Sequence, residues 1–222
     1  MTRMKKKLII IGCGGFGREV AWLVERINEK EHQWDFLGFV DDDQSLEGTI
    51  IDGYPILGDM DWLLEQTEEL YVTCSIAKPA IRSKLIERCQ KKENIHFPIL
   101  VDPSAIIGKT VQIGEGSIIC AQTIMTVDAI LGKHVIINLA CTIGHDAVLD
   151  DYVTLYPTVN VSGHVHIGTH TEIGTGTQII QGLTIGEDTI VGAGGVVIRD
   201  IPSHCTAVGD PAKPIKYHGK TK

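Results

Sequence analysis

The chain has 222 residues, of which 43% are hydrophobic, so it is long and apolar enough for one large or two small packed domains. Its formal net charge of -8 disfavours nucleic acid as a partner, because nucleic-acid-binding proteins usually present a basic face. A local site can still bind an anionic nucleotide against this overall charge.

The cysteines and the N-terminal segment indicate in which compartment the protein is expected to work. The six cysteines contain no C-x-x-C pair, which favours reduced thiols over a zinc ribbon or a disulfide framework. The apolar stretch after the basic start, residues 8–11, stops at a glycine and is too short for a signal peptide or a membrane span. We therefore expect a cytoplasmic protein without membrane insertion.

The first expected elements form a strand, a glycine-rich turn and a helix. A strand over 5–11 precedes Gly12-Cys13-Gly14-Gly15-Phe16-Gly17, and a helix is expected over 18–29. A G-x-G-x-x-G segment in this position is typical of a turn that binds phosphate at a helix N-terminus. The alternative is a tight turn without a ligand.

The rest of the first hundred residues continues the strand and helix alternation. A strand over 36–40 ends in Asp41-Asp42-Asp43, and acids about twenty positions after a glycine loop suit ribose hydroxyls. Further elements are expected over 70–75 (strand), 80–92 (helix) and 95–100 (strand). This pattern predicts a half-Rossmann α/β domain over residues 1–100. Because the second mononucleotide half is missing, a nucleotide-sugar fits better than a dinucleotide.

The second half of the chain repeats every six residues. Sixteen consecutive positions at this spacing are aliphatic: Ile107, Ile113, Ile119, Met125, Leu131, Ile137, Ile143, Leu149, Leu155, Val161, Ile167, Ile173, Ile179, Ile185, Val191 and Val197. An α-helix cannot keep such side chains on one face, whereas short strands separated by corners can. Three repeats would close a triangular coil of about eighteen residues, so residues 101–222 are predicted to form an all-β parallel β-helix.

These hexapeptides and the ending Val208–Lys213 resemble the left-handed β-helix acyltransferase superfamily. The segment 138–168 is similar to hexapeptide sugar acetyltransferases that modify UDP-4-amino sugars or sialic acid. The resemblance implies a left-handed helix, a homotrimer, acetyl-CoA as acyl donor, and CoA bound in a groove between adjacent chains. It also implies a role in surface-glycan biosynthesis.

His145-Asp146 is the candidate catalytic pair. Acyl transfer from a thioester needs a base to take a proton, and this pair places an imidazole beside a carboxylate near a corner of the repeat. A solvated histidine is the simpler alternative. In the family, a histidine followed by an acidic residue occupies this place, which implies His145 as general base and Asp146 as the carboxylate that orients it.

The remaining expected contacts divide between the two substrates. For the nucleotide-sugar we expect Gly14, Gly15, Phe16, Asp41, Asp42, Ala77 and Lys78. For acetyl-CoA the resemblance implies Thr154, Gly163, Thr175, Ala193 and Gly194. Three positions depart from the family pattern: some relatives have histidine at Phe16 and at Thr154, and Gly-Asn at Ala77-Lys78. The departure at Thr154 weakens one implied CoA contact, and those at Phe16 and at Ala77-Lys78 leave the sugar open.

Several alternatives remain open from the sequence. Gly163 and His164 lie eighteen residues after His145 and Asp146, so His164 either supports the pair or decorates the surface. The leading function is N-acetylation of a UDP-4-amino sugar, and O-acetylation of sialic acid or another sugar is the alternative. A zinc enzyme similar to carbonic anhydrase, using His164, His166 and His170, and a non-catalytic nucleotide-sugar sensor are less favoured, and no metal is expected.

Overall fold

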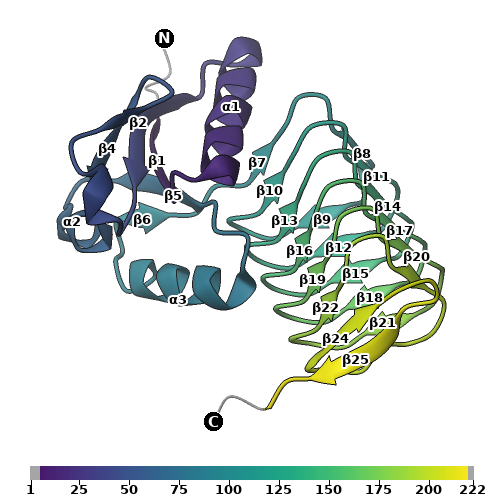
Figure 1. Cartoon of the computed structure of the whole chain (residues 1–222). Coiled ribbons are helices and arrows are strands. Elements are labelled where there is room, and N and C mark those ends of the chain that lie inside the picture. The colour runs from purple at the N-terminus through teal and green to yellow at the C-terminus, as the bar shows by residue number, and fades with distance from the viewer. Residues whose placement is uncertain (1–5, 220–222) are drawn as a thin grey trace. The chain divides into compact units, whose positions relative to one another are not determined.

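The computed structural model describes residues 6–219, and the chain divides into two compact units between Pro103 and Ser104. Figure 1 shows an α/β unit followed along the chain by a stack of short strands.

The α/β unit contains one sheet with the strand order β3-β4-β2-β1-β5-β6. The strands are β1 (Lys6–Ile11), β2 (Trp34–Val40), β3 (Ile50–Ile51), β4 (Tyr54–Gly58), β5 (Leu70–Cys74) and β6 (Ile95–His96). All neighbours are parallel except β3 and β4. The helices are α1 (Gly15–Lys30), α2 (Met60–Glu65), α3 (Pro79–Cys89) and the 3-10 helix η1 (Gln44–Leu46). Residues 8–11 of the central strand β1 are buried, as expected for a parallel sheet covered on both faces.

The structure confirms most elements expected in this unit and corrects three. Helix α1 begins at Gly15, inside the glycine segment, and α3 ends at Cys89 rather than at residue 92. The strand expected over 95–100 is two short strands, β6 and β7 (Leu100–Val101), separated by a segment containing Pro98, which has no N–H to donate. The elements between Gln44 and Glu65 were not expected. Lys5, the first residue of the expected β1 strand, lies outside the described residues.

The second unit is a left-handed parallel β-helix with three faces. The first face contains β10 (Ile118–Ile119), β13 (Ile136–Ile137), β16 (Thr154–Leu155), β19 (Glu172–Ile173) and β22 (Ile190–Val191). The second contains β8 (Ile106–Ile107), β11 (Ile124–Met125), β14 (Thr142–Ile143), β17 (Asn160–Val161), β20 (Gln178–Ile179) and β23 (Val196–Val197). The third contains β9 (Gln112–Ile113), β12 (Ile130–Leu131), β15 (Val148–Leu149), β18 (His166–Ile167) and β21 (Thr184–Ile185).

The predicted eighteen-residue coil is confirmed by the strand register. Ile119 pairs with Ile137 on the first face and Met125 with Ile143 on the second, each eighteen residues apart. From residue 119 onward every aliphatic residue of the six-residue series is buried. Ile107 and Ile113 are only half-buried, because β8 and β9 end their sheets and have a stacked neighbour on one side only. The hairpin of β24 (Cys205–Val208) and β25 (Lys213–Tyr217) follows the last coil (Figure 1).

The corners between faces use left-handed backbone conformations. At the corner between the second and third faces, Asp128, Asp146 and His164 have φ of 55°, 57° and 56°, and Gly182 continues the column at 75°. At the corner between the first and second faces the corresponding column ends in Gly176 and Gly194. Since each column repeats every eighteen residues, side chains of successive coils stack along a corner.

Candidate active site

His145 and Asp146 form a close pair at the corner between the second and third faces. His145 lies between β14 and β15, and its Nδ1 is 2.8 Å from Asp146 Oδ2. The Asp146 N–H donates to the Val127 carbonyl of the preceding coil, at 3.1 Å, which fixes the corner. The side chains are 53% and 45% exposed. The structure therefore brings the predicted catalytic pair together on the surface, where a substrate can reach it.

Gly163 provides the space that the His145 ring occupies. A Cβ at position 163 would lie 2.5 Å from the ring, so a residue with a side chain would displace it. The next residue, His164, donates its backbone N–H to the His145 carbonyl at 2.9 Å. The predicted stacking by eighteen residues thus places Gly163 under the His145 ring, but the ring itself, and not a ligand, occupies the space that this glycine leaves.

His164 lies against both members of the pair. Its Nε2 is 3.7 Å from Asp146 Oδ2, and its ring meets the His145 ring edge-on, with centroids 4.9 Å apart. His145, Asp146 and His164 each offer a ligand atom within 4.8 Å of the others. Among the described residues, this is the group whose spacing would allow it to hold a metal ion.

The arrangement assigns different roles to the two ring nitrogens of His145. If Asp146 accepts a hydrogen bond from Nδ1–H, the lone pair of the ring lies on Nε2, where it can take a proton from a substrate. A nearby carboxylate also stabilises the imidazolium that forms. This geometry is compatible with a general base that is oriented by a carboxylate.

The other histidines considered for zinc do not converge on one point. His166 lies on the third face, where its Nε2 is 2.9 Å from Asp150 Oδ2. His170 lies at the corner between the third and first faces, with Nδ1 3.5 Å from Asp188 Oδ1. His164, His166 and His170 therefore pair with three different carboxylates.

The residues expected to bind CoA occupy two different corners. Thr175 and Gly194 lie at the corner between the first and second faces, where the Gly194 N–H donates to the Thr175 carbonyl at 2.8 Å. Ala193 precedes Gly194, and all three residues are exposed. His145 and Gly163 lie at the opposite edge of the second face, so one chain does not bring these groups together. Thr154 is fully buried, so in this structure it offers no atom to a ligand.

The glycine segment of the α/β unit shows two kinds of glycine. Gly17 packs against β1, because a Cβ there would lie 2.1 Å from the Gly12 carbonyl oxygen. Gly14 and Gly15 face open space at the start of α1, and Gly14 caps the helix without a side-chain hydrogen bond. The first N–H groups of a helix left open in this way attract anions such as phosphate. Phe16, also expected here, is half-buried.

The acids after β2 are already engaged with the backbone. Asp41 Oδ2 accepts from the N–H and the thiol of Cys13, at 3.0 and 3.1 Å, and Oδ1 accepts from the Asp43 N–H at 3.1 Å. Partial burial alone would raise the pKa of Asp41, but these hydrogen bonds outweigh it and lower that pKa. Burial, followed by the bond to Asp41, raises the pKa of Cys13 to about 11. Asp42 Oδ1 accepts from the Met60 N–H at the start of α2, at 2.9 Å. Asp41 thus fixes the glycine turn, and Asp42 fixes α2.

Ala77 and Lys78 follow β5, the strand beside β1. The Ala77 carbonyl accepts from the Arg82 guanidinium at 2.8 Å, and Arg82 is fully buried. A Cβ at Gly12 would lie 2.7 Å from Ile76 Cδ1, so this loop contacts the glycine turn. Lys78 is exposed. The predicted nucleotide-sugar residues therefore gather at the carboxyl ends of β1, β2 and β5, where open α/β sheets bind ligands.

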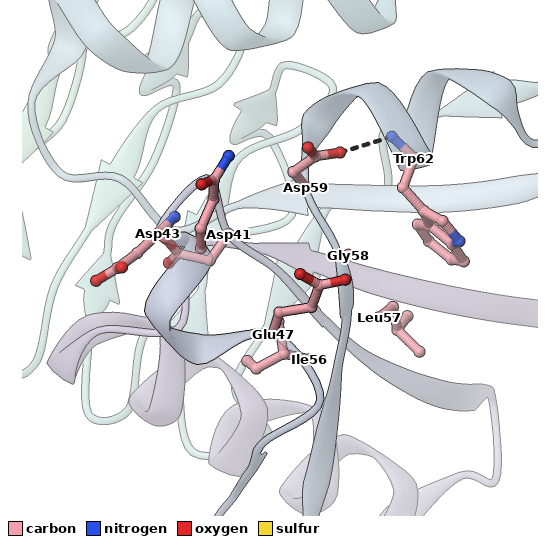
Figure 2. Close-up of a pocket in the computed structure, with 9 residues that line it drawn as sticks. Asp41, Asp43, Glu47, Ile56, Leu57, Gly58, Asp59 and Trp62 are labelled. Carbon is pink, nitrogen blue, oxygen red and sulfur yellow. Dashed lines mark hydrogen bonds between the residues drawn. The ribbon is translucent and has the colours of Figure 1, made fainter.

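A cavity of about 190 Å³ lies at the carboxyl ends of β2 and β4. Figure 2 shows Asp43 and Glu47 reaching it from the segment after β2, and Asp59 and Trp62 from the start of α2. Of the acids Asp41-Asp42-Asp43 noted in the sequence, Asp41 and Asp43 line it. The other lining residues were not predicted, although Asp52-Gly53 is typical of a hairpin turn and Asp59 of a helix cap.

Comparison with known proteins agrees with the fold of the chain. The family described as the PglD N-terminal domain matches residues 7–89. The acetyltransferase domain of PglB from Neisseria gonorrhoeae FA1090 is 31% identical, with a TM-score of 0.86 over 95% of this chain and 100% of that one. WeeI from Acinetobacter baumannii AYE is 33% identical, with a TM-score of 0.85 over 95% and 100%. PerB from Caulobacter crescentus, solved with CoA and GDP-perosamine, is 31% identical, with a TM-score of 0.85 over 95% and 97%.

Curated relatives match a smaller part of their own length. A serine acetyltransferase of Synechococcus elongatus is 34% identical over 99 residues, and an acyl-[acyl-carrier-protein]–UDP-N-acetylglucosamine O-acyltransferase of Pseudomonas syringae is 31% identical over 109 residues. The chain spans 41% and 42% of these two proteins. Within residues 6–219, the helices are too short or too polar to cross a bilayer. Fold, repeat and near full-length structural likeness together show that the chain belongs to the hexapeptide-repeat sugar acetyltransferases.

Proposed function

We propose that the protein transfers the acetyl group of acetyl-CoA to the amino group of a nucleotide-linked 4-amino sugar, with His145 as general base. The observation that carries this proposal is the exposed His145–Asp146 pair, with Nδ1 and Oδ2 2.8 Å apart and Gly163 leaving room for the imidazole ring. Membership of the acetyltransferase family supplies the reaction class.

The reaction proceeds by direct attack. The sugar amine attacks the thioester carbonyl, a C–N bond forms, and His145 Nε2 takes the proton that the amine loses. Asp146 stabilises the resulting imidazolium. When the tetrahedral intermediate collapses, the C–S bond breaks and His145 returns the proton to the CoA thiolate. Atoms and charge balance, so the chemistry needs no metal and no acyl-enzyme.

The state of the cysteines supports transfer without a covalent intermediate. All six are buried in the structure. Burial raises the pKa of Cys141, the residue before strand β14, to about 11. A thiol that is buried and protonated is a poor nucleophile. A direct attack by the amine therefore fits better than an acetyl-cysteine.

The nucleotide part of the acceptor is proposed to bind the α/β unit. The open N-terminus of α1 at Gly14 and Gly15 would receive the diphosphate, and the cavity beside Asp41 offers a site for the nucleoside. The resemblance to UDP-4-amino-sugar enzymes favours uridine. GDP is the competing nucleotide, because GDP-perosamine is bound in the PerB neighbour.

A homotrimer is proposed as the active form. The exposed residues expected to bind CoA, Thr175, Ala193 and Gly194, lie one face away from His145, and a side of six residues spans roughly 15–20 Å. A head-to-tail contact that places one chain's Gly194 corner beside the next chain's His145 closes into a ring of three. Light scattering after size exclusion should give three times the mass of the chain.

The proposed cellular role follows from the two substrates. Acetyl-CoA and nucleotide-sugars are made in the cytoplasm, and an acetamido sugar carried on a nucleotide is the activated form that glycosyltransferases use. We therefore propose a cytoplasmic step in surface-polysaccharide biosynthesis.

An acceptor screen tests the proposed function. UDP- and GDP-linked 4-amino sugars, their 4-hydroxy counterparts and free sialic acid are incubated with acetyl-CoA, and release of the CoA thiol is followed. We expect release with a nucleotide-linked amino sugar, and loss of about 10³-fold in kcat on His145→Ala, within the usual range for a general base. Release with sialic acid alone would replace N-acetylation by O-acetylation, and an unchanged His145→Ala rate would exclude His145 as the base.

A further inference from the structure

We propose that His164 is a positioning residue that holds the Asp146 carboxylate in place for His145. This inference rests on the proposed role of His145 as general base. It starts from the observation that the Asp146 carboxylate lies between two imidazoles, with Oδ2 2.8 Å from His145 Nδ1 and 3.7 Å from His164 Nε2.

The corner itself leaves the catalytic pair exposed. Asp146 is 45% exposed and His145 is 53% exposed, so water competes for both side chains. The backbone contacts fix the main chain of this corner and not the rotation of the two side chains. A catalytic base must hold its geometry closely, since small displacements reduce the rate strongly. A further contact is therefore needed to restrict these rotations.

His164 contacts both side chains that must be restricted. Its ring packs edge-on against the His145 ring, with an interplanar angle of 87° and centroids 4.9 Å apart. The 3.7 Å separation from Asp146 is longer than a hydrogen bond, so it acts as an electrostatic contact or through one water molecule. Together the contacts oppose rotation of the His145 ring and of the Asp146 carboxylate.

The residues that stack at this corner show which substitutions of His164 the backbone tolerates. His164 has a left-handed backbone with φ of 56°, and Gly182 holds the same position one coil later. Glycine and asparagine both tolerate this conformation. His164→Gly therefore removes the imidazole without straining the backbone, and His164→Asn keeps a side-chain N–H donor at the same corner.

The experiment measures kcat and KM for both substrates in the full-length protein. We expect His164→Gly to lower kcat about tenfold and to leave both KM values within about twofold, while His164→Asn restores most of the rate. In an Asp146→Asn background, His164→Gly should lower kcat by less than it does in the starting protein, because its contact with that carboxylate is already lost and only its contact with the His145 ring remains. His166→Ala is the matched control, since His166 pairs with Asp150 on the third face, and its kcat should stay within about twofold of the starting protein.

Three outcomes would overturn the proposal. The first is that His164→Gly keeps its kcat while His145→Ala abolishes turnover. The second is that glycine and asparagine lower kcat equally, and the third is that the effects of His164→Gly and Asp146→Asn multiply. If instead His145→Ala is fully active, the proposed general base is wrong and the failure lies with the proposed function.

Discussion

The β-helix and the α/β unit hold their candidate functional residues in different ways. In the β-helix, His145 and Gly163 occupy corner positions whose backbone is set by strand pairs eighteen residues apart. In the α/β unit, Gly17 packs against the Gly12 carbonyl and Asp41 accepts from Cys13, and neither contact belongs to a repeating pattern. The comparison teaches that a corner of the β-helix can change its side chains without changing the fold, whereas the glycine turn cannot.

The largest expected effect is on the stability of the α/β unit. In Gly17→Ala the new Cβ would lie 2.1 Å from the Gly12 carbonyl oxygen, and backbone cannot move aside as a side chain can. We expect a loss of about 3 kcal/mol in the free energy of unfolding, as for other overpacked sites. This exceeds the roughly 1 kcal/mol that alanine gains over glycine in a helix. Thermal unfolding followed by circular dichroism measures the change.

Gly15→Ala is the matched control within the same helix. Its Cβ meets no atom within 4 Å, and its φ is not in the left-handed region, so stability should be unchanged or slightly higher. If the start of α1 binds the diphosphate, the added methyl group should raise KM for the nucleotide-sugar by about tenfold, equivalent to roughly 1.4 kcal/mol. Equal melting temperatures for Gly17→Ala and Gly15→Ala would contradict the prediction that the close contact at Gly17 constrains the glycine turn.

The next effect is on activity and is expected in the β-helix. In Gly163→Ala the new Cβ would lie 2.5 Å from the His145 ring, which can rotate away. We expect kcat to fall by about 10²-fold, since small misplacements of a catalytic group have effects of that size, with little change in melting temperature. In a His145→Ala background the same substitution should leave the residual rate unchanged. A large loss of stability would show that this corner is as constrained as the glycine turn.

The smallest effect is the pH dependence contributed by Asp41. Its pKa is lowered in the folded state, so its carboxylate stabilises the fold above the unfolded pKa near 3.9 and this contribution is lost as pH falls through the lowered value. Asp41→Asn should therefore cost about 1 kcal/mol at pH 7, and its difference from the starting protein should shrink toward pH 3. Urea midpoints at several pH values measure this difference. The exposed β2 residue Asp35, changed to Asn, serves as control, and a gap for Asp41→Asn that widens in acid would contradict the assignment.

The sequence predicted the β-helix better than the α/β unit, for a physical reason. Sixteen aliphatic positions each report the same period, so one ambiguous residue does not alter the conclusion. The His145–Asp146 pair could be found because it departs from that background. In the α/β unit the decisive features are single contacts. Two examples are the bond from the fully buried Arg82 to the Ala77 carbonyl and the bond from the Cys13 N–H to Asp41. Neither contact belongs to a repeated sequence pattern from which it could be predicted.

The residues expected to bind CoA show where prediction from the sequence stops. The resemblance supplied Thr175, Ala193 and Gly194 at one corner and Gly163 at another. The eighteen-residue period already separates the two corners, because Thr175 lies twelve residues after Gly163, but the sequence does not show which corner of another chain would lie beside either of them. The burial of Thr154 likewise could not be predicted from its position in the repeat, since outward-facing positions of a strand are normally exposed. Both properties depend on contacts beyond a single hexapeptide.

The eighteen-residue register limits how such a chain can gain or lose length. Removing one complete coil from β17 onward would leave every later residue on its own face and shorten the prism by one layer. Removing a single hexapeptide would turn everything after it by a third of a revolution, and Thr175 and Gly194 would then lie on a different edge. Length variation among proteins built this way should therefore occur in whole coils, or in loops that leave the corners and do not alter the count.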